Sequence, residues 1–165
     1  MPKALILVAD GSEEIEFVTP YDVPDHADVQ ALNDPHETFD ILILPGGGPG
    51  SKTFCESNDV LQLIHGFQQK SKYIAAICAA TTALVASAEK FEIAKARVTS
   101  HPSVANDVKA KGWEYSEERI VVDGRVITSR GPGTAMLFAL TIVELLCGKE
   151  KRGEIAGPMV LAESL

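Results

Sequence analysis

Short, uninterrupted apolar runs that each end in a polar or glycine-rich turn restrict the fold of this chain more than any other feature. Residues 3–9 end at Asp10-Gly11, and residues 40–44 end at a glycine-rich turn. A third run, residues 73–77, leads directly into a stretch of small residues. Continuous apolar runs of this length are typical of strands buried on both faces, as in a parallel sheet. We therefore expect parallel strands with helices between them.

Helical spacing of apolar residues fills most of the intervals between these runs. The predicted helices cover residues 58–69 with Ser57 as N-cap, 79–89, 103–111 and 134–147. Residues 97–99 predict a short strand, and residues 120–128 predict a hairpin that turns at Asp123-Gly124. Strands that alternate with helices indicate an α/β three-layer sandwich with a mainly parallel sheet. The length of 165 residues fits a single domain over residues 1–165.

Residues 17–39 fit this arrangement poorly. Pro20, Pro24 and Pro35 fall where a crossover helix is needed, and a helix interior does not tolerate proline. Only scattered apolar residues accompany them. We expect that this span covers a face of the sheet poorly.

Composition excludes several classes of function. Hydrophobic residues make up 45% of the chain and charged residues 23%, and the formal net charge is −8. Because phosphate contacts need clustered Lys and Arg, this charge argues against a nucleic-acid groove, and it also disfavours an acidic membrane surface. Apolar stretches are too short for a membrane span, and the first residues do not resemble a secretory signal. We therefore expect a cytoplasmic protein with no membrane partner.

Cys78 is the strongest candidate for a reactive side chain, because it stands between an apolar run and a predicted helix. A residue at such a junction is expected on a sharp turn, exposed at the carboxyl end of the sheet and above a helix N-terminus. The free N–H groups and the helix dipole favour an anion there, so we expect a lowered pKa and a thiolate at neutral pH. The alternative is a buried, inert cysteine. Cys55 and Cys147 lack such a turn.

Two further side chains are candidates for proton transfer. Glu16 follows the end of the first strand beside Ile15 and Phe17, so its carboxyl is expected to have a raised pKa and to donate a hydrogen bond to a nearby thiolate. The alternative is a solvated acid in a first helical turn. His101 follows a predicted strand, where it is either a base or proton shuttle or a hydrogen-bonded loop residue.

The glycine-rich turn at residues 46–53 nearly matches a phosphate-binding loop. Ser51 stands where that loop needs glycine, and Pro49 removes an N–H group from the cradle. We therefore disfavour nucleotide binding. Gly47 and Gly48 are predicted instead to present backbone N–H groups to an oxyanion. Arg130 is expected to tie down its loop rather than to bind a carboxylate.

Five motifs, in this order, resemble the ThiJ/PfpI superfamily. They are ADGSEEIE at residues 9–16, LPGGG at 44–48, AAICAA at 75–80, TSHP at 99–102 and ITSRGPGT at 127–134. They look most like the branch of the Parkinson-disease-associated protein deglycase. The resemblance implies a flavodoxin-like sandwich that forms a homodimer. It also implies that Cys78 is the reactive cysteine, that Glu16 hydrogen-bonds it with His101 nearby, and that Gly47 and Ala79 supply the N–H groups of an oxyanion pocket.

The activities of this family imply the function that we predict. They include conversion of methylglyoxal to lactate, proposed removal of glyoxal adducts from proteins and nucleotides, and protection against oxidative stress. We predict a thiol enzyme for small dicarbonyls that needs no cofactor or metal, in the cytoplasm with nuclear and mitochondrial populations. The first alternative is a redox sensor or chaperone in which Cys78 is oxidised to a sulfinate. An amidotransferase or protease ranks last because no acid stands near His101 in the sequence, and a binding protein without chemistry is a further alternative.

One departure from the family falls between Val23 and Pro24. Relatives carry the rest of the first helix and further strands there, with an arginine among them, whereas this sequence joins the two sides directly. A parallel crossover needs about a dozen residues or more, so a true deletion would damage the sheet and the dimer surface. Either the protein is a shortened form or the sequence omits a segment, and we favour the omission. Contiguous Cα atoms lie about 3.8 Å apart, so the distance between the Cα atoms of Val23 and Pro24 distinguishes a true deletion from an omitted segment.

Overall fold

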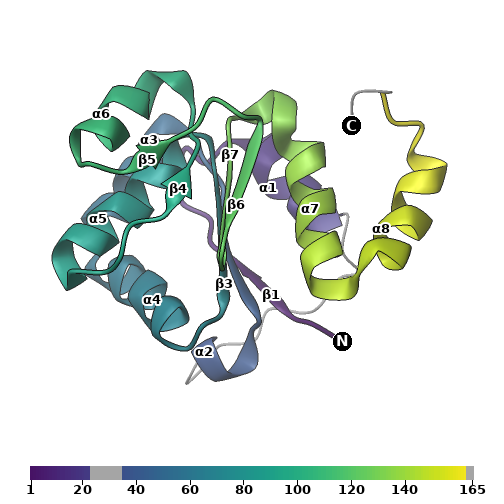
Figure 1. Ribbon diagram of the computed structural model, residues 1–165, viewed down its shortest axis with the longest axis horizontal. Helices are drawn as coiled ribbons and strands as arrows, with labels where there is room; N and C mark the ends of the chain where they lie inside the picture. Colours follow the sequence, from purple (N-terminus) through teal and green to yellow (C-terminus); the bar gives the residue numbers. More distant parts are fainter. Residues whose placement is uncertain (23–34, 163–165) are drawn as a thin grey trace.

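The computed structural model describes residues 1–22 and 35–162 and shows a five-stranded sheet between layers of helices (Figure 1). The strand order is β1-β2-β3-β7-β6. The strands β1 (Ala4–Ile6), β2 (Ile41–Leu44), β3 (Tyr73–Ile77) and β7 (Val126–Ser129) are parallel, and β6 (Ile120–Asp123) pairs with β7 in the antiparallel sense. The sheet is therefore mainly parallel, as the sequence predicts.

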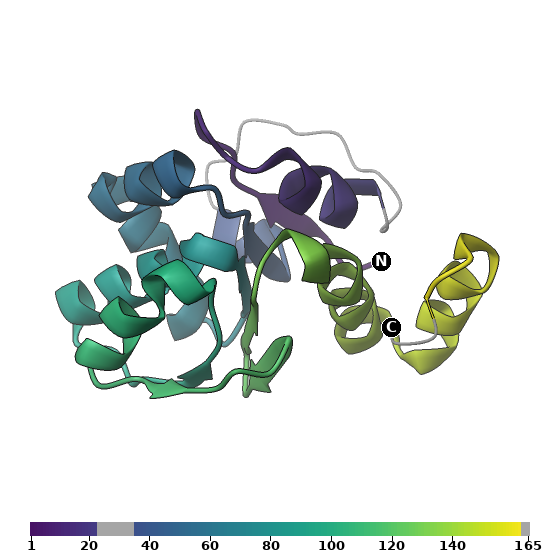
Figure 2. The same cartoon turned by 90° about the horizontal axis from the view of Figure 1, so that it is seen from above.

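Helices lie on both sides of this sheet, as the two views show (Figures 1 and 2). On one side are α3 (Gly48–Glu56), α4 (Asn58–Gln69) and α5 (Thr81–Phe91), and on the other are α1 (Glu14–Asp22) and α7 (Ala135–Cys147). The last helix, α8 (Lys149–Ala156), packs on the outside of α7. Among the described residues, no helix combines the length and the apolar character that a membrane crossing requires.

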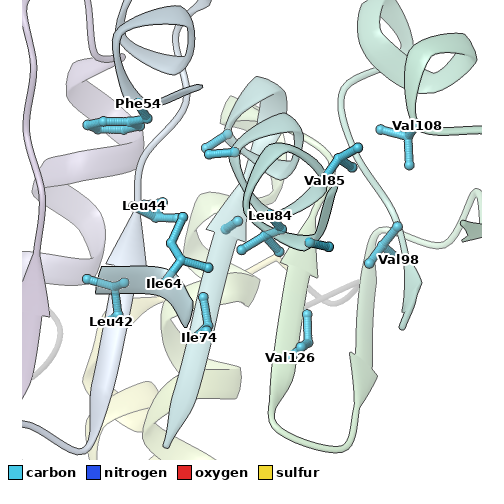
Figure 3. Packing of buried hydrophobic residues seen from close by; sticks show 14 of the residues in the cluster. Leu42, Leu44, Phe54, Ile64, Ile74, Leu84, Val85, Val98, Val108 and Val126 are labelled. Atoms are coloured by element: carbon cyan, nitrogen blue, oxygen red, sulfur yellow. The ribbon is translucent and has the colours of Figure 1, made fainter. Parts of the chain in front are cut away.

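The central strands supply a core on each face because their side chains alternate. Leu42 and Leu44 of β2 pack with Ile74 of β3 against α3, α4 and α5 (Figure 3). The intervening residues Ile41 and Ile43 belong to the opposite core, which includes Phe138 and Ile142 of α7. Both sets in β2 are fully buried, which explains why the sequence of this strand is apolar throughout rather than alternating.

A second, smaller sheet lies beside the main one. It pairs β4 (Arg97–Val98) with β5 (Glu114–Tyr115) in parallel, and α6 (Ala105–Ala110) lies in the connection between them. The predicted hairpin is confirmed: Asp123 pairs with Val126, and Gly124 in the turn has a φ of 57°. Ser57 is confirmed as the N-cap of α4, since its hydroxyl accepts a hydrogen bond from the Val60 N–H group.

Four features of the helices were not predicted from the sequence. Pro20 lies inside α1, which ends only two residues later, so the missing hydrogen bond affects the last turn and not a long helix. Pro35 begins the short helix α2 (Pro35–Thr38), a position that needs no N–H donor. The glycine-rich turn continues into α3 because Pro49 occupies its first turn. Helix α8 was not expected, since its sequence has no apolar face.

Strand β1, at the edge of the sheet, is less buried than the sequence predicted. Residues of β1 are only partly buried, because β1 has a partner strand on one side only among the described residues. Helix α1 packs against α7, so the span after Phe17 does contribute to the layer on this face as far as Asp22. Val23 and Pro24, the two sides of the suspected missing segment, lie outside the described residues.

Candidate active site

The carboxyl ends of two central strands and helix α1 bring the candidate residues together. Cys78 follows β3, and Gly46 and Gly47 follow the neighbouring strand β2. Glu16 comes from α1, which begins shortly after β1. Because the carboxyl ends of parallel strands share one edge of the sheet, residues distant in sequence meet there.

The backbone at Cys78 has the strained geometry of a nucleophile elbow. Its φ is 64°, in the left-handed region that side chains other than glycine rarely adopt, at a cost of about 1–2 kcal/mol. Strand β3 ends at Ile77, and a 3-10 turn over Cys78–Ala80 leads into α5. The predicted sharp turn is confirmed. The predicted exposure is wrong, because Cys78 is only 9% exposed.

Two backbone N–H groups point at the sulfur of Cys78. They belong to Gly47, at the start of α3, and to Ala79, in the turn after β3, and both donate to the sulfur. Gly48, in contrast, is exposed as the first residue of α3, and its N–H group is not one of the two donors to the sulfur. The structure therefore assembles two of the three predicted donors around the sulfur.

Gly46 is the contact point between Glu16 and Cys78, a role that the sequence did not reveal. Its N–H group donates to Glu16 Oε2 at 2.8 Å. A Cβ atom at this position would lie 2.5 Å from Glu16 Oε2 and 2.6 Å from the Cβ atom of Cys78. Gly47 also has no room for a side chain. Its φ is 87°, and a Cβ atom there would clash with the Gly11 carbonyl oxygen at 2.2 Å.

Glu16 is fully buried, and its expected raised pKa is confirmed. Burial raises the pKa of this carboxyl to about 7, although the thiol of Cys78 and the N–H group of Gly46 both act in the opposite direction. The other carboxyl oxygen, Oε1, has no partner with full hydrogen-bond geometry among the described residues. Glu16 is therefore a buried acid that can hold or release a proton near neutral pH.

The expected lowered pKa of Cys78 is wrong. Burial raises the pKa of this thiol to about 11, and the negative charge of Glu16 adds to the shift. The N–H groups of Gly47 and Ala79 favour the thiolate but are outweighed. The helix N-terminus alone suggested an exposed thiolate, whereas the folded chain buries the sulfur beside a second acid.

The two acids therefore titrate as a pair. The negative charge of Glu16 raises the pKa of the thiol, and by the same repulsion a thiolate would raise the pKa of the carboxyl. When Glu16 is protonated, its repulsion of a thiolate disappears and its O–H group can donate to the sulfur. A thiolate thus becomes accessible by moving the thiol proton to Glu16, with no change in the net charge of the pair.

His101 lies at the same edge of the sheet and is hydrogen-bonded to the backbone of Cys78. Its backbone N–H group donates to the Cys78 carbonyl oxygen at 3.2 Å. Its Nδ1 atom accepts from the Ser103 N–H group at 3.2 Å and lies 2.7 Å from Ser103 Oγ. In this arrangement Nδ1 carries no proton, so Nε2 is the protonated nitrogen of the neutral ring. Among the described residues, no carboxylate hydrogen-bonds this ring.

The remaining candidates play structural parts. Arg130 donates from Nη1 to the Glu117 carbonyl oxygen at 2.9 Å, which confirms that it ties down its loop. Cys55 is half-buried with Sγ 3.3 Å from Thr82 Oγ1, and burial raises the pKa of its thiol. Cys147 is exposed at the end of α7.

Comparison with known proteins identifies the family of the chain. The sequence profile of the DJ-1/PfpI family matches residues 26–145, which is more than half of the chain. The chain belongs to the DJ-1/PfpI family. It is 35% identical over 188 aligned positions to the Parkinson disease protein 7 homolog of Danio rerio, covering 98% of each chain. It is 31% identical to the glutathione-independent glyoxalase DJ-1 of Schizosaccharomyces pombe, covering 92% of this chain and 94% of that one.

Solved structures of the DJ-1/PfpI family share the fold. The crystal structure of DJ-1beta from Drosophila melanogaster superposes with a TM-score of 0.81 at 36% identity, covering 98% of this chain and all of that one. The flavodoxin-like sandwich that the resemblance implied is therefore confirmed.

Proposed function

We propose that this protein converts small 2-oxoaldehydes such as methylglyoxal to 2-hydroxy acids, with Cys78 as nucleophile and Glu16 as general acid and base. The observation that carries the proposal is the pKa of about 7 for a buried carboxyl beside a strained cysteine. A general base is most effective when its pKa lies near the working pH. The name of the fission yeast relative, a glutathione-independent glyoxalase, supports the same reaction class.

The first step joins the sulfur to the aldehyde carbon of the substrate. Ionised Glu16 takes the proton of the Cys78 thiol, and the thiolate adds to the aldehyde to form a C–S bond. The N–H groups of Gly47 and Ala79 stabilise the negative oxygen that develops. Protonated Glu16 then returns its proton to that oxygen, which gives a hemithioacetal and restores the carboxylate.

The second step moves hydrogen between the two neighbouring carbons. Glu16 removes the proton from the former aldehyde carbon, and an enediol forms when the adjacent carbonyl oxygen gains a proton. The Nε2–H group of His101 is the proposed donor to that oxygen. Protonated Glu16 returns its proton to the adjacent carbon, and the hydroxyl group on the former aldehyde carbon gives its proton to His101 Nε2. These transfers leave the thioester of a 2-hydroxy acid and restore both residues. Water then cleaves the C–S bond, so the net change is addition of one water molecule to the oxoaldehyde.

Removal of early glyoxal adducts from proteins or nucleotides is a finer proposal that uses the same chemistry. In an early adduct the sulfur would instead attack the carbon that carries both the hydroxyl group and the amine. The C–S bond would form as the C–N bond breaks, and the amine would leave with the proton that Glu16 took from the thiol. Because Cys78 is 9% exposed, we propose that free oxoaldehydes react faster than adducts on a folded protein.

Replacement of the nucleophile tests the proposed reaction. Cys78→Ser should abolish the conversion of methylglyoxal to lactate by purified protein, measured by loss of substrate and by an enzymatic assay for lactate. Cys55→Ser is the matched control, because this half-buried cysteine lies on α3 and not in the proposed machinery. A Cys78→Ser variant with most of the wild-type activity would refute the proposal.

A redox function of the same cysteine is the second candidate. Three donors surround the sulfur, namely the N–H groups of Gly47 and Ala79 and the O–H group of protonated Glu16, and they would stabilise the oxygens of a sulfinate. Peroxide should then add the mass of two oxygen atoms at Cys78. Such oxidation together with negligible turnover of dicarbonyls by the reduced protein would favour this function.

We also propose that the chain forms a homodimer that includes α1. Ile15, Val18 and Tyr21 recur at three-residue spacing on α1, and each is between 44% and 50% exposed. Burial of such a stripe against a second copy would remove apolar surface from water. In analytical ultracentrifugation the wild type should sediment as a dimer and Val18→Glu as a monomer. A wild type that stays monomeric at all concentrations would exclude the proposed homodimer.

We further propose that a segment is missing from the sequence between Val23 and Pro24. The alignment with the zebrafish relative runs over 188 positions, which exceeds the 165 residues of the chain, so that relative has residues without a counterpart here. The intact mass of the protein from its natural source decides this, because the present sequence corresponds to 17.7 kDa.

A further inference from the structure

Gly131 occupies a buried position between Cys78 and His101 and takes no part in the proton transfers proposed above. It follows β7, whose carboxyl end lies beside that of β3. A Cβ atom at this position would lie 4.0 Å from Cys78 Sγ and 3.4 Å from His101 Cδ2. The point directly beside the Gly131 Cα atom is therefore within contact distance of both the nucleophile and the histidine ring.

The backbone around Gly131 does not by itself require glycine. Its φ is 163°, which is extended backbone that any residue adopts. Its N–H group donates to Thr134 Oγ1 at 3.1 Å, and its carbonyl oxygen accepts from the Thr134 N–H group at 2.8 Å. Ser129 Oγ lies 2.6 Å from the same Thr134 hydroxyl, so the loop is held in place by its own hydrogen bonds. Neither the turn nor the backbone conformation therefore requires glycine at position 131.

A side chain at position 131 would therefore mainly reduce the space beside the sulfur of Cys78. In the part of the chain that the structure describes, and apart from the neighbours of Gly131 in sequence, only Cys78 Sγ and His101 Cδ2 lie within 4 Å of the position of a Gly131 Cβ atom. The contrast with Gly46 is clear, since a Cβ atom there would meet three atoms at 2.8 Å or less. Gly46 is needed for packing, whereas Gly131 leaves a small volume next to the reacting atom.

We infer that Gly131 is a specificity-determining residue, and that the space it leaves receives the group carried on the second carbonyl of the substrate. The inference rests on the proposed reaction at Cys78. After the C–S bond forms, the second carbonyl carbon and its substituent are the atoms next nearest to the sulfur. Because Gly131 has no Cβ atom, the side of the sulfur that faces it is less obstructed, and we expect it to accept a hydrogen or a methyl group more readily than a larger group. The site therefore selects small oxoaldehydes, namely glyoxal and methylglyoxal, over those with a large substituent.

Adding one methyl group to the loop tests this directly. In Gly131→Ala, kcat/KM for methylglyoxal should fall about 10-fold to 200-fold, the discrimination that one methyl group supplies in a tight pocket, while kcat/KM for glyoxal falls much less. Gly133→Ala is the matched control, because a Cβ atom at this exposed glycine of the same loop meets no atom of the described residues within 4 Å. This control should keep the wild-type ratio of the two substrates.

An equal loss for both substrates in Gly131→Ala, or an unchanged ratio, would overturn the inference. Alkylation of Cys78, followed by mass spectrometry of its peptide, gives a readout that does not need turnover. Gly131→Ala should slow reaction with N-phenylmaleimide more than reaction with iodoacetamide, and the same slowing of both reagents would contradict it. If the wild type converts neither dicarbonyl, the proposed reaction fails, yet the alkylation ratio still decides whether Gly131 limits access to the sulfur.

Discussion

The centre of the sheet and its β1 edge differ in burial, and the active site draws on both. Residues of β2 are completely buried, and in β3 only Tyr73 is not, whereas β1 is partly buried and α1 leaves Ile15 about half exposed. The nucleophile and the N–H groups of the oxyanion pocket come from the centre. The acid, Glu16, comes from the edge and is itself fully buried. Chemistry at Cys78 therefore depends on the docking of a helix whose outer face is exposed in the single chain.

Replacement of the acid should give the largest effect. Glu16→Gln keeps the size of the side chain and an oxygen for the Gly46 N–H group, but it cannot accept the thiol proton. We expect kcat to fall about 10²-fold to 10⁴-fold, as for removal of a general base. Steady-state assays with methylglyoxal measure this. The wild-type rate should also rise with pH through about 7, where Glu16 ionises, and this inflection should be absent from the variant.

A matched pair of isoleucines tests the difference in packing between centre and edge. Ile43→Ala in β2 removes a fully buried side chain and should lower the free energy of unfolding by about 2–5 kcal/mol. In the monomeric Val18→Glu background, Ile15→Ala in α1 removes a side chain that is 49% exposed and should change the free energy of unfolding by no more than about 0.5 kcal/mol. Urea denaturation followed by circular dichroism gives both values. Equal losses would mean that the two regions are packed alike.

The buried acid should also make stability depend on pH. The pKa of Glu16 is raised from 4.5 to about 7 on folding, so the folded state holds a proton that the unfolded state releases between these values. The protonated carboxyl therefore stabilises the fold below pH 4.5, relative to a carboxylate, and this contribution is lost as pH rises through 7. The loss is about 3 kcal/mol at most. Wild type should thus lose more stability than Glu16→Gln between these pH values, and parallel profiles would refute the assignment.

The sequence predicted best what depends on local pattern. Apolar runs located β2 and β3, and the change from strand to helix located Cys78, since both signals lie within a few residues. The spacing of Glu16 after the first strand also predicted its raised pKa correctly. Helix α3 was missed because three consecutive glycines and a proline are typical of a loop, and α8 because it lacks an apolar face.

The predictions that failed depend on contacts between distant segments. The pKa of Cys78 was expected from the helix N-terminus alone, whereas burial and the charge of Glu16 determine its direction. The parts played by Gly46 and Gly131 could not be predicted for the same reason. Each becomes visible only when a strand end is placed beside the thiol, although a glycine that directly follows a strand is a signal worth examining.

Gly46 carries a consequence for the evolution of the chain. Only a hydrogen atom fits between the carboxyl of Glu16 and the side chain of Cys78 at this point. In a library containing all nineteen replacements at each position, codon 46 should therefore yield no active clones, although Gly46 itself neither donates nor accepts a proton in the reaction. Selection for activity would hold this position invariant as strictly as it holds the cysteine.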